Sequence, residues 1–459
     1  MSHTNEETRP FHQLPIGERR RLIADYLGES LSDITSTLDQ GGIDPLIADK
    51  LVENVLGIYA LPFGVARHFV INGIERWVPM VVEEPSVIAA ASNAAQRAGQ
   101  GGGFRAETRE DLMTAQIQLQ GVADPALAEQ RLLAESAALL ALAQAQVPGL
   151  MARGGGPRAL QVRDLGEGFL VVHLHVDCLD AMGANLVNTI AEGIGPRVAA
   201  IAGGTLGLRI LTNLSDKRRV FVECTIPWQG LIKRKSERAS SSNAPRSTDD
   251  DARDPKAHAA LTRAQREEAE RVAEAIENAS RFAERDPYRA TTHNKGIMNG
   301  IDSVVIATGN DYRAVEAGAH AFAARSGAYR PLATWRRQGD GLYGCMELPL
   351  ALGIVGGTLR VHPTAQLALR LMRVSSASEL AQIAAAAGLA SNFAALRALC
   401  TDGIQKGHMA LHARGVATLA GAKGDEVEHV ATALMKGRRV NVESAGVLLE
   451  QLRSCSGVR

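Results

Sequence analysis

The segment Asp286–Asp311 holds the densest group of side chains that could carry out acid–base chemistry. Its sequence is DPYRATTHNKGIMNGIDSVVIATGND, in which Arg289 and Lys295 lie six residues apart. Asp311 closes an apolar stretch, Val304–Thr308, whose β-branched residues predict a strand. Glycine, asparagine and threonine interrupt the charges, which a solvated surface loop does not require. The pattern therefore favours a functional cluster.

The motif EEPS, residues 83–86, follows a predicted strand, Trp77–Val82, and precedes an alanine-rich helix. Proline suits the first position of a helix, so we expect Glu84 near the helix N-terminus and Ser86 in its first turn. A carboxylate there could act as a general acid. Taken alone, however, the motif is more often a helix capped by an anion.

A turn of small residues, DAMGAN at Asp180–Asn185, separates a predicted strand from a predicted helix, Met182–Ile201. Asp180, Met182, Gly183, Ala184 and Asn185 would let a ligand approach the helix N-terminus, whose free amides suit a phosphate. No GxGxxG motif lies at this turn, so a Rossmann fingerprint is absent. A purely structural tight turn and a nucleotide site remain equally open.

Two histidines in GHMALHARG, His408 and His412, are four residues apart and could share one face of a helix. Met409 follows His408 where HExxH has a glutamate, and no third ligand is suggested, so we predict no metal site. Core or surface histidines and a single catalytic histidine both remain open.

Composition indicates a soluble, enzyme-sized protein. The 459 residues suggest two to four domains, and 50 basic against 50 acidic residues leave no net charge to favour nucleic acid or an anionic membrane. Five scattered cysteines form neither a disulfide framework nor a zinc motif, which fits a reducing cytoplasm. The N-terminus lacks the apolar stretch of a signal peptide, and no uninterrupted apolar run is long enough to span a membrane.

Periodicity predicts an α+β fold in which helices dominate. The expected helices are Pro85–Arg97, Ala126–Gln144, Met182–Ile201, Ala259–Glu284, Ala314–Ala324, Ser378–Ala387 and Asn392–Ile404. The expected strands are Arg76–Val82, Ala115–Val122, Gly168–Asp177, Leu208–Asn213, Arg219–Thr225 and Val304–Thr308. The glycine run Gly99–Gly103 marks a boundary before an inserted second domain. The charged, serine-rich segment Lys233–Lys256 predicts a mobile loop, more simply a tolerated insertion than a docking element.

Taken together, these segments resemble the soluble bacterial class II form of 3-hydroxy-3-methylglutaryl-CoA (HMG-CoA) reductase. The motifs that carry the resemblance, in order, are ENVLG (Glu53–Gly57), VPMVVEEPSVIAAAS (Val78–Ser92), DAMGAN (Asp180–Asn185), DPYRATTHNKGIMNG (Asp286–Gly300), ATGND (Ala307–Asp311) and GHMALHARG (Gly407–Gly415). The likeness runs from about Asp44 to Glu426, except for roughly Trp228–Arg281.

The resemblance implies a helix-rich, substrate-binding large domain formed by 1–110 and 215–404, with the polar insertion at about 229–258. It implies an inserted α/β domain at 111–214 that binds NADH or NADPH without a classical Rossmann fold. A helical C-terminal flap at 405–459 would carry the histidine. The implied assembly is a homodimer with active sites at the interface, and a hexamer is compatible with it.

The resemblance also assigns residues. The catalytic set would be Glu84, Lys295, Asp311 and His408. The substrate contacts would be Ser86, Arg289, Asn299, Asn213, Glu53 and Asn54, and the dinucleotide turn would be Asp180–Asn185. The reaction would be the reduction of HMG-CoA to mevalonate and coenzyme A, with Lys295 stabilising the oxyanion, Asp311 holding Lys295 in place and His408 protonating the thiolate.

Ala141–Val147, ALAQAQV, offers neither an acidic residue for the ribose hydroxyl nor an arginine for a 2′-phosphate, so the preference between NADH and NADPH is undecided. Counting from Asp124–Pro125 predicts that Val147 lies near the family's acidic position. The same enzyme could instead oxidise mevalonate catabolically, or the chain could be an inactive CoA- or nucleotide-binding relative.

Overall fold

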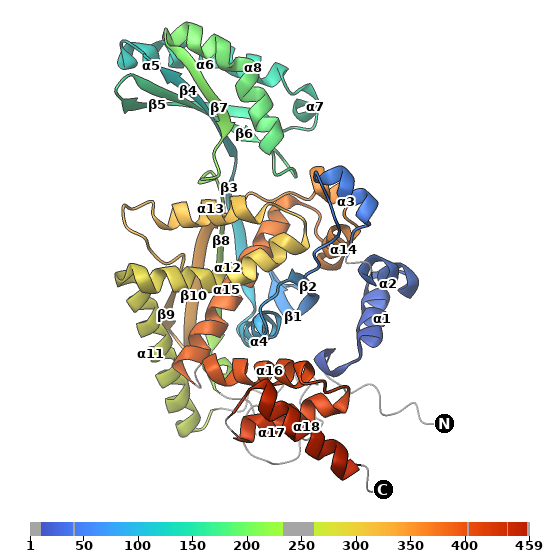
Figure 1. Ribbon diagram of the computed structural model, residues 1–459. Coiled ribbons are helices and arrows are strands. Elements are labelled where there is room, and N and C mark those ends of the chain that lie inside the picture. The colour runs from blue at the N-terminus through green and yellow to red at the C-terminus, as the bar shows by residue number, and fades with distance from the viewer. Residues whose placement is uncertain (1–10, 40–41, 233–260, 402–403, 438, 457–459) are drawn as a thin grey trace.

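A computed structural model describes residues 11–39, 42–232, 261–401, 404–437 and 439–456, and within these ranges the side chains of 404–411 and a few others are not described. The polar segment Lys233–Lys256, predicted to be a mobile loop, lies outside the described residues. The chain is a mixture of helices and sheets, as the sequence predicts (Figure 1).

The larger of two sheets has the strand order β2-β1-β3-β8-β10-β9. Its strands are β1 (Phe63–Ile71), β2 (Ile74–Val81), β3 (Phe104–Asp111), β8 (Arg218–Pro227), β9 (Ala333–Gln338) and β10 (Gly341–Pro349). Alternate residues of β8, such as Val220, Val222 and Cys224, are buried in the main core. The intervening Arg219 pairs instead with Glu110 and Glu347, so this sheet has one apolar and one charged face.

Helices cover the apolar face of this sheet, and they share its core (Figure 1). They are α4 (Val87–Gly99), α11 (Arg263–Arg285), α12 (Pro287–Ala307), α13 (Tyr312–Ala323) and α15 (Ala377–Cys400). Helix α14 (Pro363–Met372) packs beside β2, and the short α9 (Trp228–Leu231) follows β8.

The predicted strand Val304–Thr308 is wrong, because these residues form the last turns of α12 and the buried Thr308 that follows it. Their β-branched side chains favour a strand only weakly. Ile297, Ile301, Val304 and Val305 are all buried, and their spacing is that of a helical face. Packing against α15 therefore outweighs local propensity.

The predicted break between Ser378–Ala387 and Asn392–Ile404 is also wrong, because α15 is one continuous helix ending at Cys400. It is long and apolar enough to cross a membrane by length and composition alone. Most of its apolar window is buried inside the protein, as expected for a core helix of a soluble protein.

The smaller sheet has the order β5-β6-β4-β7 and is antiparallel throughout. Its elements are β4 (Met113–Gln120), α5 (Pro125–Ala134), α6 (Ser136–Ala145), α7 (Pro148–Met151), β5 (Gly156–Gly166), β6 (Phe169–Asp177), α8 (Ala184–Ala202) and β7 (Thr205–Leu211). The helix predicted at Ala126–Gln144 is interrupted at Glu135, which separates α5 from α6. A separate hydrophobic core joins these helices to one sheet face.

The glycine run Gly99–Gly103 does not mark the change from one sheet to the other. It forms the turn from α4 to β3, and both of these elements belong to the core of the larger sheet. The chain passes to the smaller sheet at Leu112, which joins β3 to β4. Gly103 is required at this turn because its φ is +88° and a Cβ would lie 2.3 Å from the Val70 carbonyl oxygen.

The two ends of the chain form smaller helical groups. At the N-terminus lie η1 (Phe11–Gln13), α1 (Ile16–Leu27), α2 (Leu31–Asp39) and α3 (Pro45–Leu51). At the C-terminus, α16 (Ile404–Leu419), α17 (Asp425–Gly437) and α18 (Val442–Ser456) share a core of their own. Figure 1 shows this C-terminal group at the opposite end of the molecule from the smaller sheet. A short turn, η2 (Gly357–Arg360), precedes α14.

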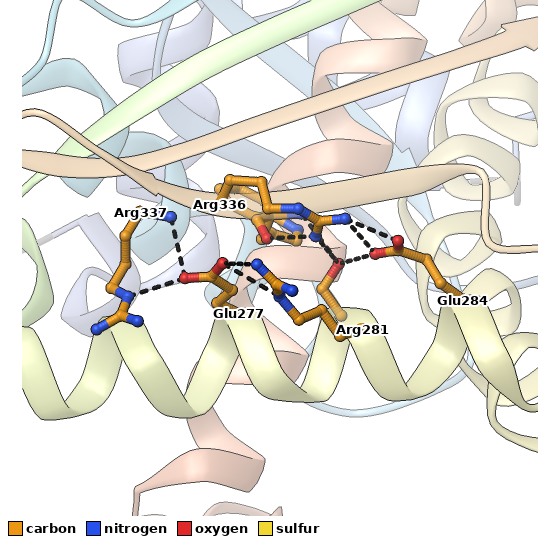
Figure 2. A network of polar contacts seen from close by, with 7 residues as sticks. Glu277, Arg281, Glu284, Arg336 and Arg337 are labelled. Atoms are coloured by element: carbon orange, nitrogen blue, oxygen red, sulfur yellow. Dashed lines mark hydrogen bonds and ion pairs between the residues drawn. The ribbon is translucent and has the colours of Figure 1, made fainter.

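A network of ion pairs fixes α11 to the edge strand β9 (Figure 2). Glu277, which is only 7% exposed, accepts from Arg281 Nη2 at 2.7 Å and from Arg337 Nε at 2.8 Å. Arg336 holds both oxygens of Glu284. Burial alone would raise the pKa of Glu277, but the hydrogen bonds from the two arginines outweigh it and lower the pKa to about 2.

Glu277→Gln should lower the free energy of unfolding at pH 7 by roughly 1–3 kcal/mol, because two arginines lose their carboxylate. The carboxylate contributes its full stabilisation above its unfolded pKa of 4.5 and loses it as the pH falls through about 2. The difference between the proteins should therefore shrink from pH 5 toward pH 2 in urea unfolding. Glu284→Gln, at a more exposed pair, should cost less; equal losses at both sites would show that the burial of Glu277 adds nothing to its ion pairs.

Candidate active site

Glu84 lies in the connection between β2 and α4. Helix α4 begins at Val87, so Pro85 is not its first residue and Ser86 is the N-cap rather than part of the first turn. Ser86 has a left-handed backbone, φ +75°, and its side chain makes no capping hydrogen bond. A left-handed serine costs free energy that packing must offset, and such strain is concentrated at functional sites.

Helix α12 brings two side chains to Glu84. Lys295 Nζ lies 2.7 Å from Glu84 Oε2, and Asn299 Nδ2 donates to the same oxygen at 3.4 Å. Lys295 and Asn299 are four residues apart, which places them on one face of α12. The Lys295 side chain is 61% exposed and that of Glu84 33%, so a ligand can reach the pair from solvent.

Asp311 is not at the end of a strand but at the N-cap of α13, where its Oδ1 accepts from Ala314 N at 3.1 Å. Among the described side chains it forms an ion pair with Arg313, at 3.8 Å. The predicted contact with Lys295 is not made among the described side chains, in which Lys295 pairs with Glu84 instead. The role of Asp311 in holding Lys295 is therefore not supported by this geometry.

The corner that carries Asp311 is tied to the DAMGAN turn through the loop after β10. Asn310 Nδ2 donates to Gly353 O, and Gly353 N donates to Asn310 Oδ1. In the same loop Ile354 N donates to Asp180 O at 2.9 Å. The loop after β10 therefore binds both the corner that carries Asp311 and the DAMGAN turn.

The DAMGAN turn leads into α8 as the sequence predicts. Gly183 is the N-cap with φ +97°, and a Cβ there would lie 2.4 Å from Cys178 Sγ, so only glycine fits without movement. Ala184 and Asn185 form the first turn of a 19-residue helix, whose free amides can bind an anion. These residues fit a dinucleotide phosphate.

Asp180 has a structural partner in this geometry. Its Oδ1 accepts from Ala377 N at 2.8 Å, at the first turn of α15, where Ser376 Oγ also accepts from Glu379 N. The Asp180 carboxylate therefore accepts a hydrogen bond from the N-terminus of α15, in the core of the larger sheet. The sequence did not predict this role.

Sequence reasoning missed Arg218, which is 3% exposed at the start of β8. Its guanidinium donates to the carbonyl oxygens of Leu179, Ala181 and Met182, and it pairs with Asp111 at 2.7 Å. Burial raises the pKa of Asp111, and Arg218 opposes that rise. Arg218 thus holds the DAMGAN turn against the larger sheet, although nothing in its sequence context signals this.

The side chains of four predicted substrate residues form no hydrogen bond or ion pair within the described part of the chain. Glu53 and Asn54 are exposed after α3, and Asn213 is exposed after β7. Arg289 is half-buried near the N-terminus of α12, close enough to Cys400 to oppose the rise in its pKa that burial causes. Within the described part of the chain, none of these four side chains forms a hydrogen bond or ion pair with Glu84 or Lys295.

His408 lies on α16, whose backbone is described there but whose side chain is not, whereas His412 is exposed. Val147 is only 9% exposed and belongs to the core of the smaller sheet. The expectation that Val147 faces a cofactor ribose is therefore wrong, because an acidic residue there would be buried among apolar side chains.

The sequence model of the "Hydroxymethylglutaryl-coenzyme A reductase" family matches residues 15–264 and 253–413, which is most of the chain. The chain belongs to the hydroxymethylglutaryl-coenzyme A reductase family. It is 41% identical to the 3-hydroxy-3-methylglutaryl-coenzyme A reductase of Archaeoglobus fulgidus, over 97% of this chain and 94% of that protein. The predicted resemblance is thereby confirmed.

Solved structures of this reductase family agree. The enzyme from Streptococcus pneumoniae superposes with a TM-score of 0.76 and 39% identity, covering 96% of this chain and 99% of that chain. A second structure, of the class II enzyme from the same organism bound to NADPH in open conformations, also gives 0.76 and covers 85% of this chain and 99% of that one. The chain is thus an oxidoreductase of the class II type.

Asp180→Ala should lower the free energy of unfolding by about 1 kcal/mol, because the Ala377 amide loses its acceptor. Asp180→Asn keeps an oxygen at that position and should lose less. Chemical denaturation of both variants measures the difference. Equal destabilisation by asparagine and alanine would mean that the charge of Asp180, rather than its acceptor oxygen, stabilises α15.

Proposed function

We propose that the protein reduces HMG-CoA to mevalonate and coenzyme A in the cytoplasm, using two hydrides from NADH or NADPH. The observation that carries this proposal is the exposed Glu84–Lys295 ion pair, with Asn299 on the same carboxylate oxygen. An ammonium beside the carbonyl oxygen would stabilise the negative charge that forms in both reduction steps, and the carboxyl group next to it would serve proton transfer in the aldehyde step. Turnover of nicotinamide absorbance with HMG-CoA as substrate tests the proposal directly.

Each hydride leaves negative charge on the carbonyl oxygen of the substrate. Lys295 would stabilise that charge in both steps, because an ammonium held in place needs no reorganisation when the charge appears. Glu84 would act as the general acid for the aldehyde step. Since Glu84 Oε2 lies 2.7 Å from Lys295 Nζ, a proton that either group delivers can be replaced from the other. Asp311 stays in the proposed catalytic set on the family resemblance alone.

His408 is proposed to protonate the thiolate of coenzyme A as it leaves. A thiol of pKa about 8.5 and an imidazole of pKa about 6.5 are matched for this transfer near neutral pH. The C-terminal helices from residue 405 onward would act as the flap that brings the imidazole to the sulfur. Helix α16, which carries His408, is the element that follows the core helix α15 in the chain.

For the substrate, Arg289 would bind the distal carboxylate in a bidentate manner, and Ser86, Asn213 and Asn299 would contact the hydroxymethylglutaryl group. Glu53 and Asn54 would complete the site across a homodimer interface. The segment that follows them supports such an interface, because Leu56 and Tyr59 are almost fully exposed, at 104% and 90%. Further assembly into a hexamer is compatible with this arrangement.

The nicotinamide cofactor would bind at residues 111–214, and the N-terminus of α8 with the Asp180–Asn185 turn would hold its phosphates. NADPH bound to the Streptococcus pneumoniae relative supports this class of cofactor. When bound, the cofactor supplies the hydrides. Residues 1–110 and 215–404 would form the substrate-binding large domain. If the enzyme instead oxidises mevalonate, cells that contain it should grow on mevalonate as carbon source. If the chain is an inactive binding protein, no turnover should be seen.

Lys295→Ala should leave a folded protein whose turnover falls by several orders of magnitude with HMG-CoA and with mevaldehyde alike, because one oxygen is stabilised in both steps. Steady-state kinetics with each substrate measures this. Arg313→Ala, which removes an exposed cation near Asp311, is the control and should change little. A loss confined to one substrate would refute the shared role of Lys295.

His408→Gln should slow HMG-CoA reduction by roughly 10²–10⁴-fold, the usual contribution of a general acid. Reduction of free mevaldehyde should be nearly unaffected, since no thiolate leaves. His412→Gln, one helical turn further on, is the matched control. If both variants are equally impaired, or if mevaldehyde reduction is lost as well, the thiolate acid is another residue.

A further inference from the structure

The chain crosses between the two sheets at two neighbouring places. It leaves the larger sheet through Leu112, which joins β3 to β4, and it returns through residues 212–217, which join β7 to β8. Leu112 N donates to Lys217 O at 2.8 Å, so the two crossings lie side by side. Next to them, Asp111 at the end of β3 is the cross-strand partner of Arg218 at the start of β8. This pair of residues therefore marks the boundary of the larger sheet.

The Arg218 guanidinium joins this boundary to the DAMGAN turn. Its Nη1 donates to the carbonyl oxygens of Ala181 at 3.0 Å and Met182 at 3.1 Å, and its Nη2 donates to that of Leu179 at 3.3 Å. Its Nε lies 2.7 Å from Asp111 Oδ1. All three nitrogens thus have partners, in a planar arrangement that a lysine ammonium cannot reproduce. Because the Arg218 side chain is only 4% exposed, water cannot readily replace a partner that is lost.

These bonds fix the direction of backbone amides in the turn as well as that of the carbonyl groups. A peptide unit is planar and trans, so its C=O and the N–H of the next residue point in opposite directions. Since Arg218 holds the carbonyl oxygens of Ala181 and Met182, the N–H groups of Met182 and Gly183 point away from it. Gly183 is the N-cap of α8. Arg218 therefore sets the orientation of the peptide groups that lead into this helix N-terminus.

Further contacts of the turn also lead to the larger sheet. Asp180 Oδ1 accepts from Ala377 N in the first turn of α15, and Asp180 O accepts from Ile354 N in the loop after β10. A Cβ on Gly353 would lie 2.5 Å from Met182 N, so this loop is packed directly against the turn. The turn follows β6 of the smaller sheet in the chain, but its position depends on elements that pack with the larger sheet.

We propose, on the basis of the function proposed above, that Arg218 is a positioning residue for the nicotinamide cofactor: its guanidinium holds the DAMGAN turn in the orientation that binds the dinucleotide phosphates. The backbone here contains two left-handed residues, Leu179 with φ +51° and Gly183 with φ +97°. A leucine keeps such a conformation only where its surroundings hold it. A turn that is held before binding loses less conformational entropy when the cofactor binds, so Arg218 raises the affinity for the cofactor.

Arg218→Lys keeps a positive charge beside Asp111 but removes the planar group that holds three carbonyl oxygens. Its Kd for NADPH, measured by titration of cofactor fluorescence, should rise roughly 10–100-fold, which corresponds to ordering one or two backbone residues on binding. The KM for NADPH should rise by a similar factor. The kcat at saturating NADPH and the KM for HMG-CoA should stay within about threefold of the wild type, because the Glu84–Lys295 pair is unchanged.

NADH should lose affinity for Arg218→Lys by the same factor as NADPH. The two cofactors share the diphosphate, which the proposal places at the DAMGAN turn, and they differ only by the phosphate on the adenosine ribose. The Kd of the variant is therefore measured for both. An effect confined to one cofactor would place the influence of Arg218 at the ribose and would overturn the proposal.

Arg219→Lys is the matched control. Arg219 is the next residue of β8, and its guanidinium pairs with Glu110 at 2.8 Å and with Glu347 at 3.0 Å on the opposite face of the strand. The same chemical change there should leave the Kd for NADPH within about twofold of the wild type, because the contacts of the DAMGAN turn are intact. An equal rise in Kd in both variants would show that loss of either arginine at this end of β8 weakens binding, and would overturn the proposal.

Asp111→Ala tests the same link from its other end, so the test does not depend on the folding of Arg218→Lys. The Asp111 side chain is 39% exposed, and its loss releases the Arg218 guanidinium from β3. The Kd for NADPH should rise, but less than in Arg218→Lys, because the bonds to the carbonyl groups remain. Asp111→Asn keeps an oxygen for Nε and should bind NADPH as the wild type does. If Asp111→Ala also binds NADPH as the wild type does, the turn is not held through β3 and the proposal fails.

Two outcomes in Arg218→Lys would overturn the proposal. A lowered Tm with an unchanged Kd for both cofactors would show that Arg218 only stabilises the fold. A raised KM for HMG-CoA with an unchanged KM for NADPH would place its effect at the substrate. Absence of HMG-CoA turnover in a wild type that binds NADPH would refute the proposed function alone, since the Kd comparison needs no turnover. A wild type that binds neither NADH nor NADPH would overturn the positioning role itself.

Discussion

The close approach of α12 to α15 sets the geometry on which the candidate active site depends. A Cβ on Gly300 would lie 2.3 Å from Ala387 O, and one on Gly388 would lie 2.7 Å from Ile301 Cγ1. Larger residues at either position would push the helices apart. Because Lys295 and Asn299 project from the open side of α12, the depth at which that helix sits decides whether they reach Glu84.

A second set of contacts joins the helices of the larger sheet to the smaller sheet. Arg218 donates to the carbonyl oxygens of Ala181 and Met182 in the DAMGAN turn and of Leu179 just before it. Asp180 accepts from the first turn of α15, and Asn310 binds the loop that also binds Asp180. These bonds are partly buried, so breaking any of them would cost free energy. The proposed cofactor turn and the corner that carries Asp311 are therefore held by the same loop, and movement of one is coupled to movement of the other.

The ion pair itself differs from these structural contacts. Lys295 is 61% exposed, so its attraction to Glu84 is screened by water and contributes little to stability. Exclusion of water by a bound substrate would strengthen the electrostatic field around the pair. An exposed ion pair costs the folded protein little free energy while no substrate is bound. It would stabilise negative charge most strongly once the carbonyl oxygen of a substrate is buried beside it. Glu277, by contrast, is buried with its arginines and serves the fold.

The mixed class of the fold, most helices and strands, and the turns around Glu84 and Gly183 could be predicted from the sequence, because they follow from local periodicity and turn chemistry. The family could be predicted from the resemblance of its short motifs. Tertiary structure alone decided that Val304–Thr308 continues a helix, that α15 is unbroken, and that Lys295 pairs with Glu84, which is 211 residues away, rather than with Asp311. Local propensities are worth tenths of a kcal/mol per residue, whereas packing and the choice of charged partner depend on distances between remote segments. The same reason explains why Arg218 gave no signal in the sequence: its role exists only where the start of β8 meets the DAMGAN turn.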